Sequence, residues 1–188
     1  MKLFVGEQLG IDCGIDEVGR GPWAGPVVAA AVVLSNDSMV KLLDDSKKLS
    51  KKKRDFLFDE IKNNSEIGIG FSSVQEIDKH NILQATFIAM KRAVGALTIL
   101  PKRALIDGNC EPPDFPCPTE TIVKGDTKVA SIAAASIVAK VTRDAYMKDL
   151  AKKYPGYGWE RNFGYGVKAH KDALKILGVT PEHRCSFK

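Results

Sequence analysis

Two apolar stretches of strand length near the start of the chain constrain the fold more than any other feature. The first, Leu9 to Asp16, is interrupted by Gly14, and the second runs from Pro26 to Leu34. Short apolar runs bounded by glycine and proline are typical of β-strands. Because the loop between these two runs is short, we predict an antiparallel hairpin.

Strand and helix patterns alternate along the rest of the chain. We predict strands over Glu66–Ser72, Arg103–Ile106 and Glu120–Lys124, helices over Ser50–Lys62 (with Ser50 as N-cap), Ser73–Leu97, Thr127–Lys153 and Lys168–Leu177, and a loop over residues 154–166. The helix after Thr127 begins with small residues, which let a helix lie close against a sheet. This order predicts a mixed α/β fold in which helices cover a sheet.

Size and composition narrow the class of protein. The chain has 188 residues and is 44% hydrophobic, enough for one sizeable core. No apolar run approaches the roughly 18 residues of a membrane span, and the first ten residues lack a signal-peptide layout, so we expect a cytoplasmic protein. The four cysteines form no Cys-x-x-Cys pair, so we expect reduced thiols rather than zinc or disulfides.

Positive charge is concentrated in two parts of the sequence. The net charge is +5, which alone is weak evidence for a polyanionic partner. Basic residues cluster in a segment from Lys47 to Arg54 and again between Lys152 and Arg184. Either cluster fits phosphate contacts or, equally well, a solvated helix face.

Four acidic residues stand at or near the ends of predicted strands: Asp16, Glu17, Asp107 and Asp126. Strand ends are where α/β folds build sites, and converging carboxylates require neutralisation by cations or protons. Oxygen ligands select hard ions, so Mg²⁺ or Mn²⁺ is the natural choice. The alternative is that each acid serves a turn or caps a helix, Asp126 in particular being placed as an N-cap.

The acidic pair runs directly into a glycine-flanked arginine. Gly19, Arg20 and Gly21 offer backbone amides and one fixed cation, which suit a phosphate or a sugar hydroxyl. An acid pair beside such a loop indicates a metal-dependent enzyme that acts on a phosphodiester.

Several long motifs in a fixed order identify a family resemblance. They are Asp16–Pro22 (DEVGRGP), Asp45–Ser50 (DSKKLS), Ile106–Asn109 (IDGN), Lys124–Asp126 (KGD), Ser131–Asp144 (SIAAASIVAKVTRD), Gly156–Gly158 (GYG), Gly164–Gly166 (GYG) and His183–Phe187 (HRCSF). Over about residues 11 to 187 the chain resembles bacterial type 2 ribonuclease H (ribonuclease HII).

The resemblance implies a fold and an activity. The fold would be the ribonuclease H-like mixed five-stranded sheet flanked by helices, with residues 1–153 as the catalytic domain and 154–188 as a short helical C-terminal extension that completes one compact unit. The activity would be endonucleolytic: cleavage of RNA in RNA–DNA hybrids and nicking of DNA duplexes 5′ to embedded ribonucleotides, leaving 5′-phosphate and 3′-hydroxyl ends.

The resemblance also assigns roles to residues. The catalytic and metal-binding acids would be Asp16, Glu17, Asp107 and Asp126, holding two Mg²⁺ or Mn²⁺ ions. The substrate contacts would be Gly19, Arg20, Gly21, Lys47, Lys48, Asn109, Lys124, Tyr165 and Arg184, with Tyr165 stacking on a sugar. We expect none of the three histidines to be catalytic.

Two other readings stay open. A type 3-like ribonuclease H would share the fold but normally carries a substantial extra N-terminal domain, and we expect none here because only about ten residues precede the first predicted strand. A non-catalytic hybrid-binding module would have lost its acids, whereas all four are present. We expect a monomer without membrane contact, and no replication-clamp peptide is evident.

Overall fold

The computed structural model describes residues 8–35, 40, 42–43 and 50–187. Its single sheet has five strands in the order β3-β2-β1-β4-β5. The strands are β1 (Asp12–Val18), β2 (Val27–Leu34), β3 (Ser65–Ser72), β4 (Arg103–Asp107) and β5 (Thr119–Ile122). The first three pair antiparallel, and β4 and β5 continue the sheet in parallel from β1. The predicted hairpin and mixed sheet are thus confirmed.

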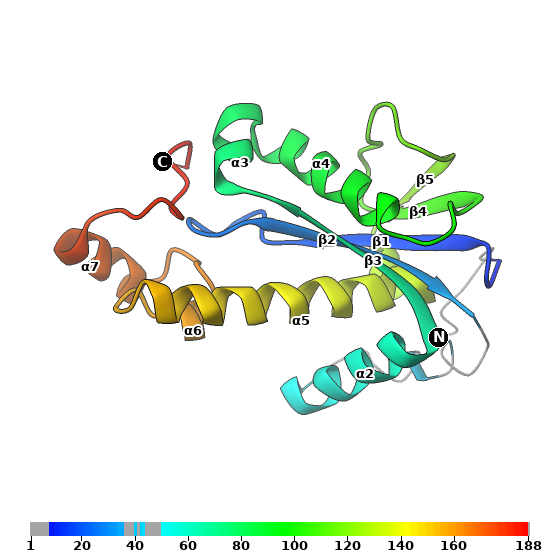
Figure 1. Cartoon of the computed structure of the whole chain (residues 1–188), viewed down its shortest axis with the longest axis horizontal. Helices are drawn as coiled ribbons and strands as arrows, with labels where there is room; N and C mark the ends of the chain where they lie inside the picture. The colour runs from blue at the N-terminus through cyan, green and yellow to red at the C-terminus, as the bar shows by residue number, and fades with distance from the viewer. Residues whose placement is uncertain (1–7, 36–39, 41, 44–49, 188) are drawn as a thin grey trace.

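Helices cover both faces of the sheet. They are α2 (Lys51–Asn64), α3 (Val74–His80), α4 (Ile82–Gly95), α5 (Ala130–Lys153), α6 (Trp159–Asn162) and α7 (Lys168–Leu177), with a 3₁₀ turn at Gly125–Thr127. α4 packs on β2 and β3 on one face, and the long α5 packs on β1 and β2 on the other (Figure 1). No helix in the described part of the chain is long and apolar enough to cross a bilayer.

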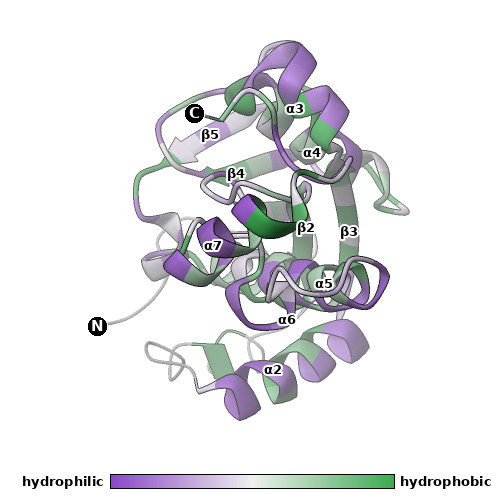
Figure 2. Cartoon of the chain, turned by 90° about the vertical axis from the view of Figure 1, so that its left-hand side faces the viewer, coloured by the Kyte–Doolittle hydropathy of each residue, from purple (hydrophilic) through white to green (hydrophobic). Residues whose placement is uncertain are grey.

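The central strand β2 divides the hydrophobic core into two layers. All eight of its residues are buried, and successive side chains point to opposite faces. Ala29 and Ala31 join the layer under α4, whereas Ala30 and Val32 join the layer under α5. α2 adds Leu57 to this second layer, and its turns alternate between hydrophilic and hydrophobic in Figure 2.

The start of α5 lies against β1 because both surfaces lack bulk. A Cβ placed on Gly14 would stand 2.1 Å from the backbone carbon of Ser131. Glycine in the strand and small residues in the helix therefore bring the helix backbone onto the strand, as the sequence predicted. The result fixes the acidic end of β1 relative to the helix.

The predicted helix Ser73–Leu97 is wrong as one element, because Asn81 breaks it into α3 and α4. Asn81 has φ 71°, and its side chain accepts hydrogen bonds from the amides of Leu83 and Gln84. The asparagine therefore ends one helix and caps the next. Ser73 starts α3 with a capping box that includes Glu76.

Other boundaries differ from the prediction as well: β1 runs over Asp12–Val18 rather than Leu9–Asp16, and β5 over Thr119–Ile122 rather than Glu120–Lys124. The helix expected from Thr127 begins at Ala130, after the 3₁₀ turn, and its N-cap is Val129, so Asp126 is not the N-cap. The segment expected to be all loop after Tyr154 contains α6. In α6, Trp159 is fully buried, and together with Met147 of α5 it belongs to a small third core that secures the extension.

Candidate active site

Asp16 and Glu17 lie within the last three residues of β1 rather than after it, since the strand continues to Val18. Asp16 is 7% exposed, and its carboxylate accepts a hydrogen bond from the Glu17 amide at 2.7 Å. The Ser136 side chain of α5 also hydrogen-bonds to it. Glu17 faces Arg20, with 3.3 Å between carboxylate oxygen and guanidinium nitrogen.

Asp107 is the last residue of β4, the strand that pairs in parallel with β1. Ile15 of β1 pairs with Ile106 of β4, so the two strands deliver Asp16 and Asp107 to the same end of the sheet. An Asp107 oxygen accepts a hydrogen bond of 2.6 Å from the Gly125 amide. This bond ties the end of β4 to the 3₁₀ turn, which carries Asp126 as its next residue.

The four carboxylates interact through their charges. Burial raises the pKa of Asp16 well above its ordinary value, and the charges of Glu17 and Asp107 raise it further. Burial likewise raises the pKa of Glu17, against the lowering effect of Arg20, and the pKa of Asp126, with Asp107 again adding to the rise. Asp107 thus acts on the other three acids, and the set favours any added positive charge.

The donor chemistry of this set fits hard divalent ions, because all its ligand atoms are carboxylate oxygens. As the side chains lie, no three Asp, Glu, His or Cys residues in the described ranges stand close enough together to hold an ion. Glu17 is turned to Arg20 and Asp107 to the Gly125 amide. Metal binding would therefore have to draw these carboxylates together.

The Gly-Arg-Gly loop follows β1 immediately, and the side chain of Arg143 packs against it. Gly19 has φ 97°, and a Cβ there would stand 2.3 Å from Nε of Arg143, so only glycine fits. The side chain of Arg20 is 48% exposed.

Tyr165 lies beside this loop although it is 144 residues further along the chain. Its ring atom Cε1 is 3.7 Å from the point where a Cβ of Gly21 would be, and the residue is 41% exposed. The Trp23 amide donates to the Gly164 carbonyl at 2.8 Å, which joins the two segments. The structure thus brings Tyr165 and Gly21 together on one exposed surface.

Comparison with known proteins decides the family. The model of the family described as ribonuclease HII matches residues 13–188. The ribonuclease HII of Jannaschia sp. (strain CCS1) is 57% identical over 96% of this chain and 91% of its own length, and that of Paramagnetospirillum magneticum is 58% identical over 95% and 90%. The ribonuclease HII of Archaeoglobus fulgidus, solved in complex with PCNA, has a TM-score of 0.78 at 27% identity over 95% of each chain.

The chain belongs to the ribonuclease HII family. Both the resemblance read from the motifs and the expected fold are confirmed.

Within this ribonuclease HII the other expected substrate contacts are distributed unevenly. Asn109 follows the strand end at Asp107, and Lys124 is exposed in a left-handed conformation (φ 57°) just before Asp126. Both therefore lie next to the acids in the chain. Lys47 and Lys48 lie outside the described residues.

Arg184 does not lie where a substrate contact was expected. The residue is 3% exposed, and its guanidinium donates to the backbone carbonyls of Gly19, Arg20 and Gly25. A buried side chain occupied in this way cannot reach a phosphate. We therefore assign Arg184 to the support of the Gly-Arg-Gly loop.

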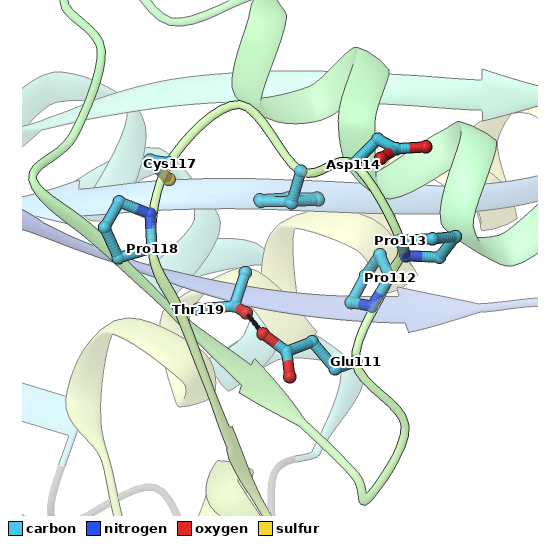
Figure 3. A pocket seen from close by; sticks show the side chains of 8 residues that line it. Glu111, Pro112, Pro113, Asp114, Cys117, Pro118 and Thr119 are labelled. Carbon is cyan, nitrogen blue, oxygen red and sulfur yellow. Dashed lines mark hydrogen bonds between the residues drawn. The ribbon is translucent and has the colours of Figure 1, made fainter.

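An open pocket beside β5 is separate from the acids of this ribonuclease HII. It is lined by residues 111–115 and 117–119, and Figure 3 shows Glu111 directed at the hydroxyl of Thr119, with which it forms a hydrogen bond. Its lining includes Glu111 and Asp114 but no lysine or arginine. This charge disfavours a nucleic-acid strand, so the pocket is not part of the candidate site.

The sequence did not reveal that Arg143, His170 and His183 are buried; Arg143 donates to the Phe163 carbonyl, and Nδ1 of His170 lies 3.0 Å from the Tyr165 carbonyl, so these two hold the segment that carries Tyr165. Arg143 was hidden within the SIAAASIVAKVTRD motif. Because Arg143 stands in the charged second half of α5, beside Asp144 and three residues after Lys140, no local pattern distinguished it from the exposed residues there.

Proposed function

We propose that this ribonuclease HII hydrolyses the RNA strand of RNA–DNA hybrids and nicks DNA duplexes on the 5′ side of embedded ribonucleotides, leaving 5′-phosphate and 3′-hydroxyl ends. One observation carries the proposal. The acidic pair Asp16-Glu17 and the Gly19–Gly21 loop are separated only by Val18, and the Tyr165 ring flanks that loop. A ribose seated at the loop would thus place its neighbouring phosphate beside the acids.

The acids would hold two divalent ions, Mg²⁺ or Mn²⁺. When bound, such ions activate a water and stabilise the leaving oxygen of a phosphodiester. Asp16 near the end of β1 and Asp107 at the end of the neighbouring β4 would be shared or direct ligands, while Glu17 would hold one ion and Asp126 the other or its waters. The raised pKa values of Asp16, Glu17 and Asp126 support this role, since burial and then the neighbouring carboxylates disfavour their charged forms and bound cations offset both effects.

Recognition would depend on the 2′-hydroxyl, which alone separates RNA from DNA at the cut sugar. Gly19, Arg20 and Gly21 would present backbone groups to that hydroxyl, and Tyr165 would lay its ring against the adjacent sugar. The exposed side chain of Arg20 would contact phosphate, together with Asn109, Lys124, Lys47 and Lys48. Phosphate contacts orient a duplex without reading its sequence, so affinity should fall steeply with salt.

The test is a cleavage assay on three labelled duplexes of one sequence: all-DNA, DNA with one ribonucleotide, and an RNA–DNA hybrid. We expect Mg²⁺- or Mn²⁺-dependent cutting of the hybrid and of the single-ribonucleotide duplex, on the 5′ side of the ribonucleotide. The all-DNA duplex should stay intact. Cutting of the hybrid alone would instead favour a type 3-like activity, and binding without any cutting would favour a hybrid-binding module.

A further inference from the structure

Two arginines lie buried behind the Gly-Arg-Gly loop without a carboxylate partner among the described residues. Arg143 is 0% exposed and Arg184 is 3% exposed. Arg143 donates to the carbonyls of Ala24, Pro26 and Phe163. Every hydrogen bond that either guanidinium makes in the described part of the chain goes to a backbone carbonyl. Burying two cations beside each other is costly, and the hydrogen bonds to these carbonyls are what offset the cost.

The nearest acids are committed to other groups. Asp144 lies close enough to influence Arg143 but forms an ion pair with Lys140 at 2.8 Å. Asp78 influences Arg184 but accepts hydrogen bonds from the amides of Cys185 and Ser186. Burial lowers the pKa of Arg143 to about 10 and that of Arg184 to about 9, so both remain charged at neutral pH.

The carbonyls that Arg184 binds determine which way the loop amides face. In a planar trans peptide the C=O of one residue and the N–H of the next point in opposite directions. Arg184 draws the carbonyls of Gly19 and Arg20 inward, so the amides of Arg20 and Gly21 face outward. Both residues are exposed, and neither amide has a hydrogen-bond partner in the described structure.

Successive outward amides form a concave site for an electronegative oxygen. The two buried guanidiniums strengthen it, because the peptide dipoles are aligned with their positive ends outward and the charges lie in a poorly screened interior. Arg143 adds the second wall, since its bond to the Phe163 carbonyl anchors the turn that carries Tyr165. Arg184 thus orients the loop amides, and Arg143 fixes the position of the segment that carries Tyr165.

We propose that Arg143 and Arg184 are positioning residues for ribose recognition: together they orient the Arg20 and Gly21 amides and the Tyr165 ring toward the same sugar. The inference rests on the proposed function and names the side chains on which its selectivity depends. It requires the branched, planar guanidinium, because an ammonium group cannot hold several carbonyls in fixed directions.

The test measures selectivity of binding in an Asp107→Asn background, which separates binding from cutting. Affinity is determined for a DNA duplex with one ribonucleotide and for the all-DNA duplex of the same sequence. We expect Arg184→Lys and Arg143→Lys to lower the ratio of the two affinities about tenfold, the effect of losing one or two hydrogen bonds. Affinity for the all-DNA duplex should change less than twofold.

Arg92→Lys is the matched control, because it makes the same exchange at an arginine that pairs with Glu76 rather than with carbonyls of the loop. It should leave the ratio unchanged. A measurement without variants guards against misfolding: amide exchange of Arg20 and Gly21 in the unmodified chain should slow more with the ribonucleotide duplex than with all-DNA.

The outcomes separate the two proposals. If the unmodified protein fails to cut the ribonucleotide duplex, the proposed function is wrong. If it cuts, but both lysine variants keep the affinity ratio or the two duplexes protect the amides equally, the positioning role of the arginines is overturned while the function stands.

Discussion

The acidic end of the sheet and the loop beside it differ in how fully their polar groups are partnered. The carboxylates of Asp16 and Asp107 have few hydrogen-bond partners, and the charge of Asp107 adds to the rise that burial causes in the pKa values of Asp16, Glu17 and Asp126. The backbone around Gly19 and Gly25, in contrast, is held by two buried guanidiniums that bind carbonyls. The acidic end therefore favours added cations, whereas the backbone of the loop is already held by the fold itself.

The largest expected effect follows from removing the central charge of the acidic end. Asp107→Asn should lower the cleavage rate by about 10²–10³-fold, the scale found when a transition-state-stabilising group is lost. Substrate affinity should stay near that of the unmodified chain, because the loop and Tyr165 are unaffected. Single-turnover cleavage measures the rate, and equilibrium binding measures the affinity. A near-native cleavage rate would show that Asp107 takes no part in the mechanism.

Acid should lower the stability of the C-terminal segment through its buried histidine pair, His170 and His183. Nδ1 of His183 accepts a hydrogen bond from the Thr180 amide, and its Nε2 lies 3.1 Å from Nε2 of His170. Burial lowers the pKa of His183 to about 4. A lowered folded-state pKa means that this stability is present above about pH 6.5 and is lost as pH falls toward 4.

The loss should reach about 3 kcal/mol of unfolding free energy, the equivalent of the shift in pKa. Denaturant titrations between pH 7.5 and pH 4 measure it. His183→Gln should flatten the pH dependence, whereas His80→Gln, at an exposed histidine, should not. Identical pH profiles for both variants would contradict the assignment.

The acidic end should show the opposite response to pH. Burial and neighbouring charges raise the pKa of Asp16, so its protonated form is favoured in the folded, metal-free protein. Stability from this group is present at acidic pH and is lost as pH rises through the raised pKa. Asp16→Asn should therefore raise the melting temperature of metal-free protein at pH 7.5, by about 2–4 °C for each kcal/mol of repulsion relieved.

Stabilisation by divalent metal gives a second test of Asp16. Mg²⁺ or Mn²⁺ should stabilise the unmodified chain more than Asp16→Asn, because the variant has lost both a ligand and part of the repulsion. Differential scanning calorimetry with and without metal provides the measurement. Equal stabilisation of the two proteins would exclude Asp16 as a ligand.

The parts of the fold that the sequence predicted are those set by local patterns. The Val27–Leu34 run is apolar throughout because the strand is buried on both faces, and Gly14 and the small residues of α5 are visible as a close contact between sheet and helix. Asn81 was missed because a polar residue within a helical pattern usually faces solvent, whereas here its left-handed backbone ends α3.

The gathering of the acids at one end of the sheet was predictable from the sequence, but the side chains that support the neighbouring loop were not. Asp16 and Asp107 lie at or near the ends of apolar strands, which is a local signal. The partners of Arg184 are carbonyls of residues 19, 20 and 25, more than 150 positions earlier. Every residue type offers a carbonyl, so no pattern distinguishes these from others, and an arginine near the end of the chain was expected to be exposed.

Substitutions of Tyr165 should give the smallest effect of this series. Its ring lies against Gly21 but is 41% exposed, so it supports the free fold little. Tyr165→Phe keeps the ring and loses one hydroxyl, so KM for the single-ribonucleotide duplex should rise about two- to tenfold, the equivalent of one hydrogen bond. Tyr165→Ala loses the stacking surface as well and should raise KM further. Thermal unfolding of both variants should match the unmodified chain; a large drop in melting temperature would mean that the ring is a structural element rather than a contact for the sugar.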